Sequence, residues 1–337
     1  MQHVKLGQSD LMVSPLTLGC WSFGGDKESY WGEQSQSEVE QIVGEALDLG
    51  VNFFDTAFGY NDGRSEISLG KALAGKRSQA VICNKIPIQK TEDLADYPQT
   101  IQNSLTRLQT DHIDLMMIHW PTKDEALLRA NLAALAKEKE RGTIRHIGVS
   151  NFAVDTLEIA RSMGIQVVAN EFAYNLVSRG IEKDVLPYCR LNHISVAAYM
   201  PLMQGILTGK YHTLEEIPAV RRRSIHFNSK TNSLARHGGN GTETELQDFL
   251  LRLGEISELS GVSTARLAIS WLTAKEGVST IIAGCRSLDQ LRENVAAVET
   301  RTDPAIVSVL DQASWPIQEK LVGILDLWNL GEGSRIW

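Results

Sequence analysis

Short apolar runs alternate along this chain with longer segments in which apolar residues recur every three or four positions. Short runs bounded by turn residues predict buried strands, and the longer period predicts amphipathic helices. The expected strands are residues 16–19, 51–55, 80–85, 113–119, 143–150, 166–171, 194–199 and 280–284. The expected helices between and after them are 37–50, 97–108, 126–141, 154–163, 183–192, 246–260, 264–274 and 288–298.

The start of the first helix has a recognisable capping pattern. Ser37 and Glu40 have the spacing of a capping box, and Val39 begins the apolar face that follows. Gly50 is expected to end this helix, since glycine is the residue that most readily terminates one. Two short apolar stretches around residues 7–10 predict a small hairpin before the main fold.

Eight strands that alternate with helices predict a (β/α)8 barrel. A doubly wound sheet is the competing fold, but it requires a G-x-G-x-x-G turn after the first strand, which Gly19 to Gly24 does not supply. We expect one barrel domain over 1–337, with 1–15 as a hairpin cap and 303–337 as an extra helix and tail. Residues 205–244 are polar, basic and rich in Gly, Ser and Asn, which predicts either a functional lid or a disordered segment.

The composition is that of an ordinary globular protein. Hydrophobic residues make up 43% of the 337 residues, charged residues 22%, and the net charge is -8. Acidic charge argues against a nucleic-acid or anionic-membrane partner. Four scattered cysteines with no ligand spacing predict reduced thiols, no metal and a cytoplasmic location. We find neither a membrane-spanning run nor the apolar core of a signal peptide.

Three titratable residues end successive predicted strands. They are Asp55, Lys85 and His119, and Tyr60 follows the first of them closely. Taken singly, each has a structural explanation: a turn aspartate, a solvated lysine, a histidine bonded to backbone, a rim tyrosine. A barrel, however, gathers the carboxyl ends of its strands around one pocket, so together they predict an active site.

The residues around these four positions resemble the aldo-keto reductase family in several separate motifs. The motifs are Asn52-Phe53-Phe54-Asp55-Thr56-Ala57, Gly63-Arg64-Ser65-Glu66, Leu69-Gly70-Lys71-Ala72-Leu73, Ile82-Cys83-Asn84-Lys85, Leu115-Met116-Met117-Ile118-His119-Trp120-Pro121 and Ile147-Gly148-Val149-Ser150-Asn151-Phe152. They fall in the family's order over nearly the whole chain. The resemblance implies a (β/α)8 barrel, a nicotinamide cofactor bound without a Rossmann domain, and hydride exchange between a carbonyl and an alcohol.

The chemistry of the four residues fits that reaction. Hydride addition to a carbonyl leaves an alkoxide, which needs a proton. A phenol is a poor acid near neutral pH, so we expect Lys85 to lower the pKa of Tyr60 and Asp55 to hold the ammonium. His119 can orient the substrate oxygen. By resemblance, Tyr60 is the general acid in reduction and the general base in oxidation, on an aldehyde or ketone, including sugar or polyol carbonyls.

The resemblance also implies where the cofactor binds. Ser150 and Asn151 hold the carboxamide, Tyr199 stacks on the ring, and Arg286 suits a 2′-phosphate, which favours NADP with NAD as the other option. The implied cofactor residues are Trp21, Asp55, Ser150, Asn151, Glu171, Tyr199, Pro201, Leu202, Gln204, Gly205, Lys210, Gly284, Arg286, Gln290, Glu293 and Asn294. We expect 205–244, with Arg221, Arg222 and Arg223, to cover the cofactor.

Aromatic residues are the expected walls of the substrate pocket. The candidates are Trp21, Trp31, Phe58, Tyr60, His119 and Trp120, with Tyr30, Trp315 and Trp328 as further possibilities. Their faces suit sugar C–H groups or flat apolar carbonyls. The sequence alone identifies no Arg or Lys placed for a substrate carboxylate.

Two positions depart from the family pattern. Glu171 stands where the family usually has a neutral amide, and Met200 replaces a serine. We hypothesise that Glu171, if ionised, favours the positively charged oxidised ring and therefore alcohol oxidation.

Three other functions compete with the carbonyl oxidoreductase. One is a cofactor-binding regulatory subunit with very slow turnover, which intact catalytic residues do not exclude. Another is a lyase that uses Lys85 as a Schiff base. The third is a glycosidase built on Asp55 and Glu171, although nothing marks these as a matched pair. For the carbonyl oxidoreductase, the expected partner is a small carbonyl compound or alcohol. The oligomeric state is left open.

Overall fold

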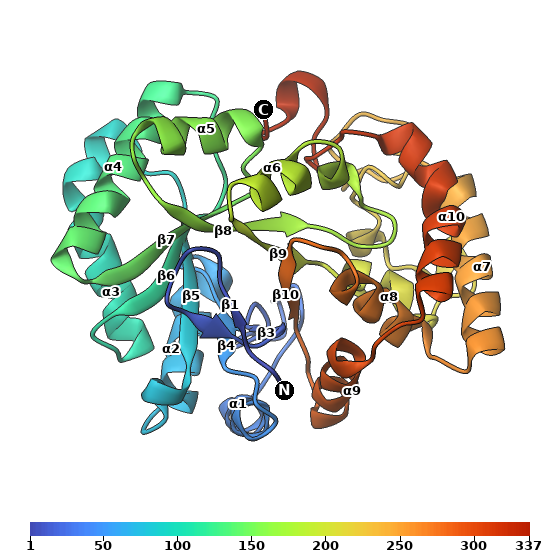
Figure 1. Cartoon of the computed structure of the whole chain (residues 1–337), viewed down its shortest axis with the longest axis horizontal. Helices are drawn as coiled ribbons and strands as arrows, with labels where there is room; N and C mark the ends of the chain where they lie inside the picture. Colours follow the sequence, from blue (N-terminus) through green and yellow to red (C-terminus); the bar gives the residue numbers. More distant parts are fainter.

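Eight parallel strands close into a barrel in the computed structural model, which describes residues 1–337 (Figure 1). The strands pair in the order β10-β3-β4-β5-β6-β7-β8-β9. Their bounds are β3 (Leu16–Gly19), β4 (Phe53–Asp55), β5 (Val81–Ile86), β6 (Ile113–Ile118), β7 (Ile144–Ser150), β8 (Val167–Ala173), β9 (Ser195–Tyr199) and β10 (Val278–Ala283). The predicted (β/α)8 barrel is confirmed, and every predicted strand overlaps an observed one.

Helices cover the outside of the barrel (Figure 1). They are α1 (Gln36–Asp48), α2 (Arg64–Ala72), α3 (Tyr97–Leu108), α4 (Glu125–Arg141), α5 (Val154–Ser162), α6 (Val185–Leu191), α7 (Glu243–Ser260), α8 (Thr264–Thr273), α9 (Leu288–Glu299) and α10 (Pro304–Leu321). Helix α2 is absent from the predicted set. Its buried face includes Ser65, Glu66, Ser68 and Gly70, so it lacks the apolar period on which the prediction depends.

The predicted cap of the first helix is wrong by two residues. The N-cap is Ser35, whose side chain accepts a hydrogen bond from the backbone N–H of Glu38, while the Glu38 carboxylate accepts from the Ser35 N–H at 2.8 Å. Both Ser35 and Ser37 have a glutamate three positions later, so the sequence spacing alone does not distinguish them.

Alternation along the strands creates two layers inside the barrel. Phe53, Cys83, Leu115 and Met117 belong to a small interior cluster of buried residues that also includes hairpin residues such as Leu6. Two positions further along β4 and β5 stand Asp55 and Lys85, on the same face because strand side chains alternate. The barrel interior is therefore apolar on the side of the hairpin and polar at the carboxyl ends of its strands.

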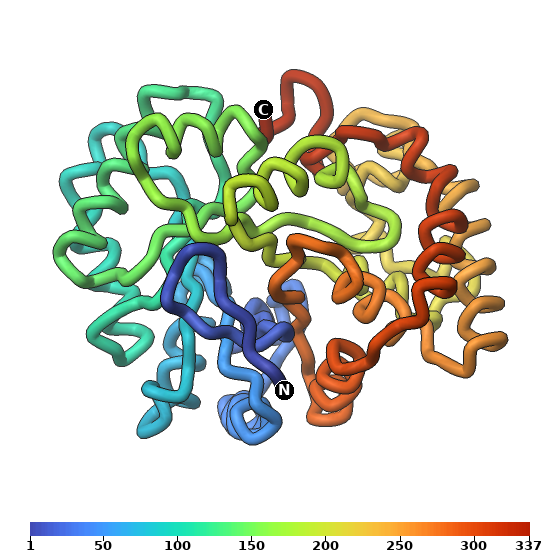
Figure 2. The backbone as a smooth tube through the Cα atoms, in the orientation of Figure 1, coloured from blue at the N-terminus to red at the C-terminus, as the bar shows by residue number.

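An N-terminal hairpin closes the opposite end of the barrel, as predicted. It consists of β1 (Val4–Lys5) and β2 (Met12–Val13), drawn dark blue across the strands in Figure 2. Gly7 allows this close approach, because its φ is +54° and a Cβ there would lie 2.2 Å from the Val168 carbonyl oxygen. Its backbone N–H donates to the Ser195 hydroxyl at 2.7 Å.

The long segment 205–244 is folded onto the rest of the protein. Its apolar side chains Ile217, Ile225 and Phe227 are buried in the main core. The Ile225 N–H donates to the Leu327 carbonyl at 2.9 Å, which joins this segment to the chain that follows α10.

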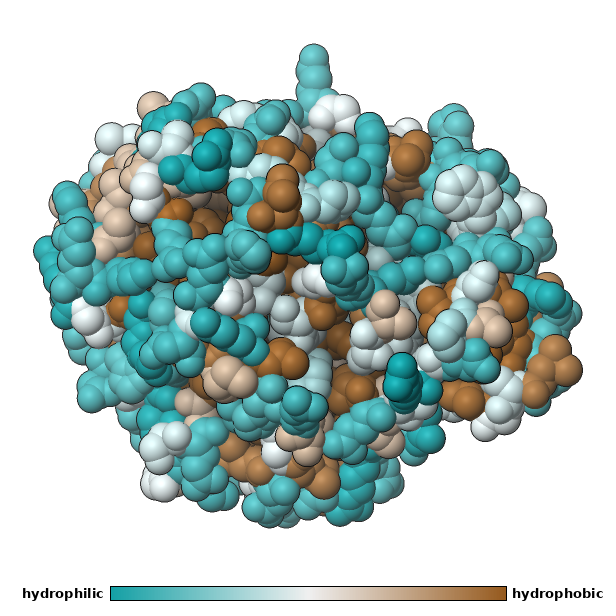
Figure 3. Space-filling model, in the orientation of Figure 1, coloured by the Kyte–Doolittle hydropathy of each residue, from teal (hydrophilic) through white to brown (hydrophobic).

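The outer surface has no wide apolar area on the face drawn in Figure 3, where hydrophobic residues form small groups among hydrophilic ones. Trp315 is 56% exposed on α10, in the outer layer, so the structure does not place it in a substrate pocket. All four cysteines are free and buried, as expected. None of the helices combines the length and apolarity needed to cross a bilayer.

Two helical glycines offer a matched test of the packing. In α2, a Cβ at Gly70 would lie 2.6 Å from the backbone of Leu108, whereas in α7 a Cβ at Gly254 meets nothing within 4 Å. We expect Gly70→Ala to lower the free energy of unfolding by about 1–3 kcal/mol through overpacking. Gly254→Ala should raise it by about 0.5–1 kcal/mol through helix propensity. Urea unfolding of both variants measures this, and equal effects would contradict the packing at Gly70.

Candidate active site

Lys85 lies at the centre of the polar layer and is completely buried. Its ammonium donates to Asp55 Oδ1 at 2.5 Å and to the Thr56 carbonyl at 3.0 Å, and it lies 3.4 Å from Glu171 Oε2. Burial lowers the pKa of Lys85, but the two carboxylates outweigh it and hold the pKa well above its usual range. Lys85 is therefore a fixed cation at the base of the pocket.

Tyr60 is held over this cation by an unusual turn. It begins a short 3-10 helix (Tyr60–Gly63), and its ring centroid lies 5.2 Å from the Lys85 ammonium. The next residue, Asn61, has φ of 48° and donates to the carbonyls of Trp21 and Phe23 at 2.9 and 2.8 Å. A left-handed non-glycine residue is strained, and strain of this kind is typical of functional sites.

The net effect on the Tyr60 phenol differs from the expectation. Burial raises the pKa of Tyr60, and the charge of Lys85 opposes it without overcoming it, because Asp55 and Glu171 add negative charge. The charge of Lys85 thus acts in the predicted direction, since it lowers the pKa of Tyr60, but burial outweighs it and the net pKa is raised. Tyr60 is instead kept as a neutral phenol, the form that can donate a proton.

His119 follows β6 and lies beside Tyr60, with ring centroids 5.8 Å apart and planes nearly perpendicular. Burial and the charges of Lys85 and Arg335 lower the pKa of His119 to about 3. The imidazole is therefore neutral near pH 7 and can donate one hydrogen bond to a substrate oxygen. The structure thus brings together all four residues predicted to be catalytic.

Glu171 is the residue that departs from the family pattern, and the structure buries it. Its Oε2 faces Lys85 but has no hydrogen-bond partner. Burial and the neighbouring Asp55 raise the pKa of Glu171 to about 8, against the opposing charge of Lys85. Burial of Glu171 therefore disfavours the ionised carboxylate that our hypothesis requires.

Polar groups from neighbouring strands meet beside Glu171. The backbone N–H of Asn151 donates to the Glu171 carbonyl at 2.8 Å, and its amide donates to the Ser150 hydroxyl at 3.0 Å. Tyr199, at the end of β9, donates its hydroxyl to Asn151 Oδ1 at 2.8 Å. The residues expected to hold a carboxamide and to stack on its ring therefore form one connected group.

An aromatic cluster stands above the catalytic residues. Trp21 stacks on Tyr60 at 5.7 Å and on Tyr30 at 5.2 Å, and Trp31 meets both Trp21 and Tyr30 edge-on. Phe58 lies apart from this cluster, with its ring 4.6 Å from the Arg107 guanidinium. The structure therefore provides an aromatic wall built mainly from the loop between β3 and α1.

Basic residues surround a glycine in the segment after β9. Gly205 has φ of +90°, and a Cβ there would lie 3.1 Å from the Lys210 ammonium and 3.5 Å from an Arg221 nitrogen. Arg221 itself donates to the Gln204 carbonyl at 3.2 Å. This part of the chain, which begins at Pro201 and Leu202, therefore brings two basic side chains against the backbone of Gly205, and basic groups of this kind can bind phosphates.

The residues expected at the adenosine end lie at the start of α9. The Arg286 guanidinium donates to the Glu33 carbonyl at 2.6 Å, and the Arg286 N–H donates to Gln290 Oε1 at 2.9 Å. Gly284 immediately precedes this turn, Asn294 is buried on α9, and Glu293 pairs with Arg266 at 3.2 Å. These side chains share one edge of the barrel's carboxyl face.

Sequence reasoning missed two residues near the catalytic group. Arg335 stacks on Trp120 with its guanidinium carbon 3.4 Å from the ring centroid, and it is close enough to His119 to lower that residue's pKa. Asp326 pairs with Arg335 at 3.2 Å. Neither lies on a periodic element, so the only available signal was a charged residue in the segment after the last expected helix.

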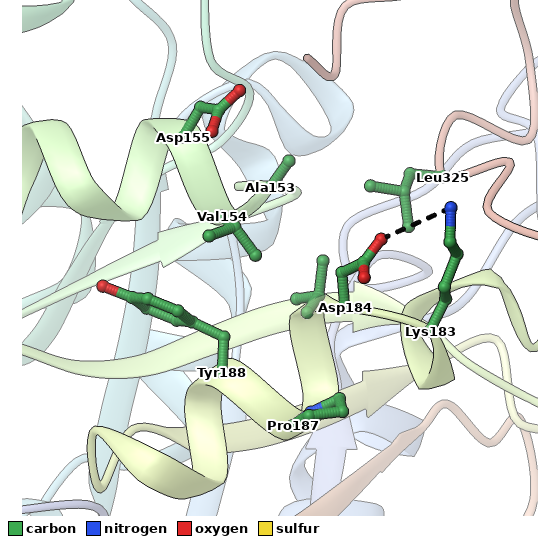
Figure 4. Close-up of a pocket in the computed structure, with 9 residues that line it drawn as sticks. Ala153, Val154, Asp155, Lys183, Asp184, Pro187, Tyr188 and Leu325 are labelled. Carbon is green, nitrogen blue, oxygen red and sulfur yellow. Dashed lines mark ion pairs between the residues drawn. The ribbon is translucent and has the colours of Figure 1, made fainter.

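A separate cavity of about 500 Å³ lies between α5 and α6 (Figure 4). Its lining includes Asp155, Tyr188 and Leu325, and the Lys183–Asp184 ion pair at 3.8 Å stands at one side. None of the four residues predicted to be catalytic lines this cavity, so the cavity is separate from the candidate active site.

A lysine–carboxylate pair beneath a tyrosine and a histidine, at the carboxyl end of a parallel barrel, defines a class of barrel oxidoreductase. The model of the aldo/keto reductase family matches residues 15–314, and the chain belongs to that family. The family prediction is therefore confirmed, together with the prediction of an oxidoreductase.

Known relatives agree with this assignment. The chain is 30% identical over 305 residues to the aldo-keto reductase YhdN of Bacillus subtilis, covering 86% of this chain and 87% of the relative. It is 29% identical to an NADH-specific methylglyoxal reductase of Escherichia coli, covering 92% and 97%. It is also 32% identical to a putative voltage-gated potassium channel subunit beta of Schizosaccharomyces pombe, covering 91% of each.

Solved structures give the same result. An aldo-keto reductase of Bacillus halodurans in its holo form superposes with a TM-score of 0.74 at 27% identity, covering 93% of this chain and 96% of that one. A thermostable aldo-keto reductase in complex with the inhibitor epalrestat gives a TM-score of 0.73 at 28% identity, covering 93% and 100%.

The raised pKa of Glu171 predicts a pH-dependent effect on stability. Between pH 4.5 and about 8 the unfolded carboxyl is ionised while the folded one keeps its proton, so this group's contribution is lost as pH rises. In Glu171→Gln this loss is absent. We expect the free energy of unfolding of the variant, relative to wild type, to rise from pH 5 to 8 by at most about 1.4 kcal/mol per pH unit. Urea titrations at pH 5, 7 and 9 measure it, and a difference independent of pH would contradict the assignment.

Proposed function

We propose that this protein is a nicotinamide-dependent carbonyl reductase and alcohol dehydrogenase, with NADP preferred and NAD as the other option. Its substrates are aldehydes or ketones and the corresponding alcohols. The observation that carries this proposal is the buried Lys85 ammonium, held at 2.5 Å by Asp55 directly beneath Tyr60. Such a group serves the transfer of a proton at the mouth of the barrel rather than the stability of the barrel alone.

The residues present fit a nicotinamide cofactor at three places. Glu171 has a buried oxygen without a partner beside the connected group of Ser150, Asn151 and Tyr199. At Gly205 the Lys210 ammonium and an Arg221 nitrogen lie against the backbone, where they could bind the phosphates of the cofactor. Arg286 lies at the far end, where a 2′-phosphate would be bound. The segment 205–244 would cover the cofactor between these points.

The proposed mechanism divides the work among four side chains. The bound nicotinamide supplies or accepts the hydride. Tyr60, kept neutral by burial, donates its proton to the oxygen of the substrate as negative charge develops there. Lys85 then stabilises the resulting phenolate, and Asp55 and Thr56 keep the ammonium in position. Neutral His119 donates a second hydrogen bond that orients the same oxygen, and alcohol oxidation uses these steps in reverse.

The lyase and glycosidase alternatives fit the site less well. A Schiff base requires a neutral amine that can reach its substrate, whereas Lys85 is completely buried and charged. A glycosidase requires two accessible carboxyl groups on either side of a glycosidic bond. Asp55 and Glu171 instead lie in the barrel interior within 4.8 Å of each other, both facing Lys85.

A regulatory subunit remains the second candidate, because one relative is a putative channel subunit beta. In that case the protein would bind the cofactor with the same residues and turn over slowly. Steady turnover of a carbonyl substrate by the purified protein would separate the two functions, since a sensor does not require it.

The role of Tyr60 predicts a large loss of turnover without a loss of binding. We expect Tyr60→Phe to lower kcat by about 10²–10⁴-fold, the usual contribution of a general acid, because it removes only the transferable proton. The dissociation constant for NADPH should stay within about threefold of wild type. Absorbance at 340 nm measures turnover, and NADPH fluorescence measures binding.

Tyr97→Phe is the matched control for this prediction. Tyr97 is also buried, its hydroxyl has no partner, and it lies on α3 outside the site. The control should retain turnover. Full activity in Tyr60→Phe would remove Tyr60 from the mechanism.

The position of Arg286 predicts the cofactor preference. We expect Arg286→Ala to weaken NADP binding about 10- to 100-fold more than NAD binding, because charge-assisted hydrogen bonds to a phosphate would be lost. Arg292→Ala, which removes an exposed arginine of the following helix α9 that pairs with Glu45, should change neither. Fluorescence titration with both cofactors measures the ratio, and equal losses in Arg286→Ala would refute the 2′-phosphate role.

A further inference from the structure

The segment after α10 returns to the catalytic face of the barrel. Trp337 donates its indole N–H to the Thr122 carbonyl at 3.0 Å, and Lys123 donates to the Glu332 carbonyl at 2.7 Å. Ile336 is buried between these two contacts along the chain. Residues 332–337 are therefore anchored to the loop that follows β6, the same loop that begins with His119.

Arg335 lies in the middle of this anchored segment and projects over Trp120. Its guanidinium carbon is 3.4 Å from the centroid of the indole, which fixes the plane of the fork. Its charge adds to the burial that lowers the pKa of His119, and it opposes the burial that raises the pKa of Tyr199. The guanidinium therefore lies near one residue proposed to be catalytic and one proposed to stack on the cofactor.

Asp326 occupies only one edge of the guanidinium. It accepts Nε at one oxygen and Nη2 at the other, both at 3.2 Å. Its own side chain is fully buried and also accepts the backbone N–H groups of Trp328 and Arg335 at 3.0 Å. Asp326 is thus a rigid support that sets the orientation of Arg335.

The opposite edge of the fork is free. Nη1 makes no hydrogen bond within the chain, and the Arg335 side chain is 39% exposed. Anchoring the segment requires only the hydrogen bonds of Arg335 to Asp326 and its stacking on Trp120. Both contacts are already made without the remaining edge. The remaining edge, Nη1 with the second hydrogen of Nη2, matches the two oxygens of a carboxylate.

We propose that Arg335 binds a carboxylate of the substrate, so that the preferred substrates are oxo acids, carbonyl compounds that carry a carboxylate. This inference rests on the proposed function and specifies its substrate class. The carbonyl reaches Tyr60 and His119 while the carboxylate pairs with the free edge of Arg335. Trp120, beneath the guanidinium, forms the wall between the two ends of the substrate.

A pair of matched aldehydes tests this proposal. 4-Carboxybenzaldehyde and methyl 4-formylbenzoate share the reacting group and differ in the charge of the far end. For wild type we expect the KM of the acid to be about 10- to 100-fold lower than that of the ester. Arg335→Met should abolish this difference by raising the KM of the acid about 10- to 100-fold more than the KM of the ester. Arg335→Lys should restore part of it, because the charge remains but the fork is lost.

A binding measurement makes the test independent of turnover and of folding. Arg335→Met leaves Asp326 buried without its partner, so the double variant Asp326→Asn with Arg335→Met removes that charge as well. Benzoate should quench the tryptophan fluorescence of wild-type holoenzyme at concentrations at least tenfold below benzamide, and neither variant should show this preference. Thermal unfolding reports whether the variants are folded.

Several outcomes would overturn the proposal. Equal KM values for the acid and the ester in wild type would do so, as would an equal rise for both in Arg335→Met, which would make Arg335 a wall alone. A clear preference for 4-formylphenyl phosphate over the acid would assign the fork to phosphate esters. If wild type reduces neither aldehyde and resembles Tyr60→Phe, the proposed function fails, while the benzoate titration still decides the role of Arg335.

Discussion

The buried ammonium of Lys85 is the constraint on which the site depends. Removing an ammonium from water costs several kcal/mol, and only close partners offset that cost. Here Asp55 at the end of β4 and the Thr56 carbonyl accept its hydrogen bonds, and Glu171 from β8 lies 3.4 Å from it. The closed barrel is what holds them at these distances, so its closure and the protonation states of Tyr60 and His119 are parts of one electrostatic arrangement.

Much of the fold could be predicted from the sequence, because a barrel repeats two simple patterns. The strands and most helices have clear periods, and Asp55, Lys85 and His119 could be assigned to one pocket from their places at strand ends alone. Helix α2 and the cap at Ser35 were missed for local reasons: a polar buried face in the first case and two equivalent spacings in the second.

Other features of the site could not be read from the sequence. The direction of the Tyr60 pKa shift depends on two large and opposite effects. Burial disfavours the phenolate, whereas the charge of Lys85 favours it. Arg335 lies 275 positions from Tyr60 in the chain and meets the site only because Trp337 and Asp326 fix the segment that carries it. No pattern of residues near Arg335 specifies that contact.

The loops that carry Tyr30, Arg223 and Trp328 are held together differently from the barrel. Arg223 lies 5.2 Å from the ring of Tyr30 and 5.8 Å from the ring of Trp328, so it joins three loops that are far apart in the sequence. Contacts between arginines and aromatic rings are individually weak, and they depend on side chains rather than on a backbone ladder. Because the segment with Arg335 is attached by such contacts and a few hydrogen bonds rather than by strand pairing, we expect that it can be exchanged without altering β3 to β10. Under the roles proposed here, the residues that select the substrate and the residues that transfer the proton can therefore diverge separately, and a graft of residues 322–337 between homologous barrels is a route to new selectivity.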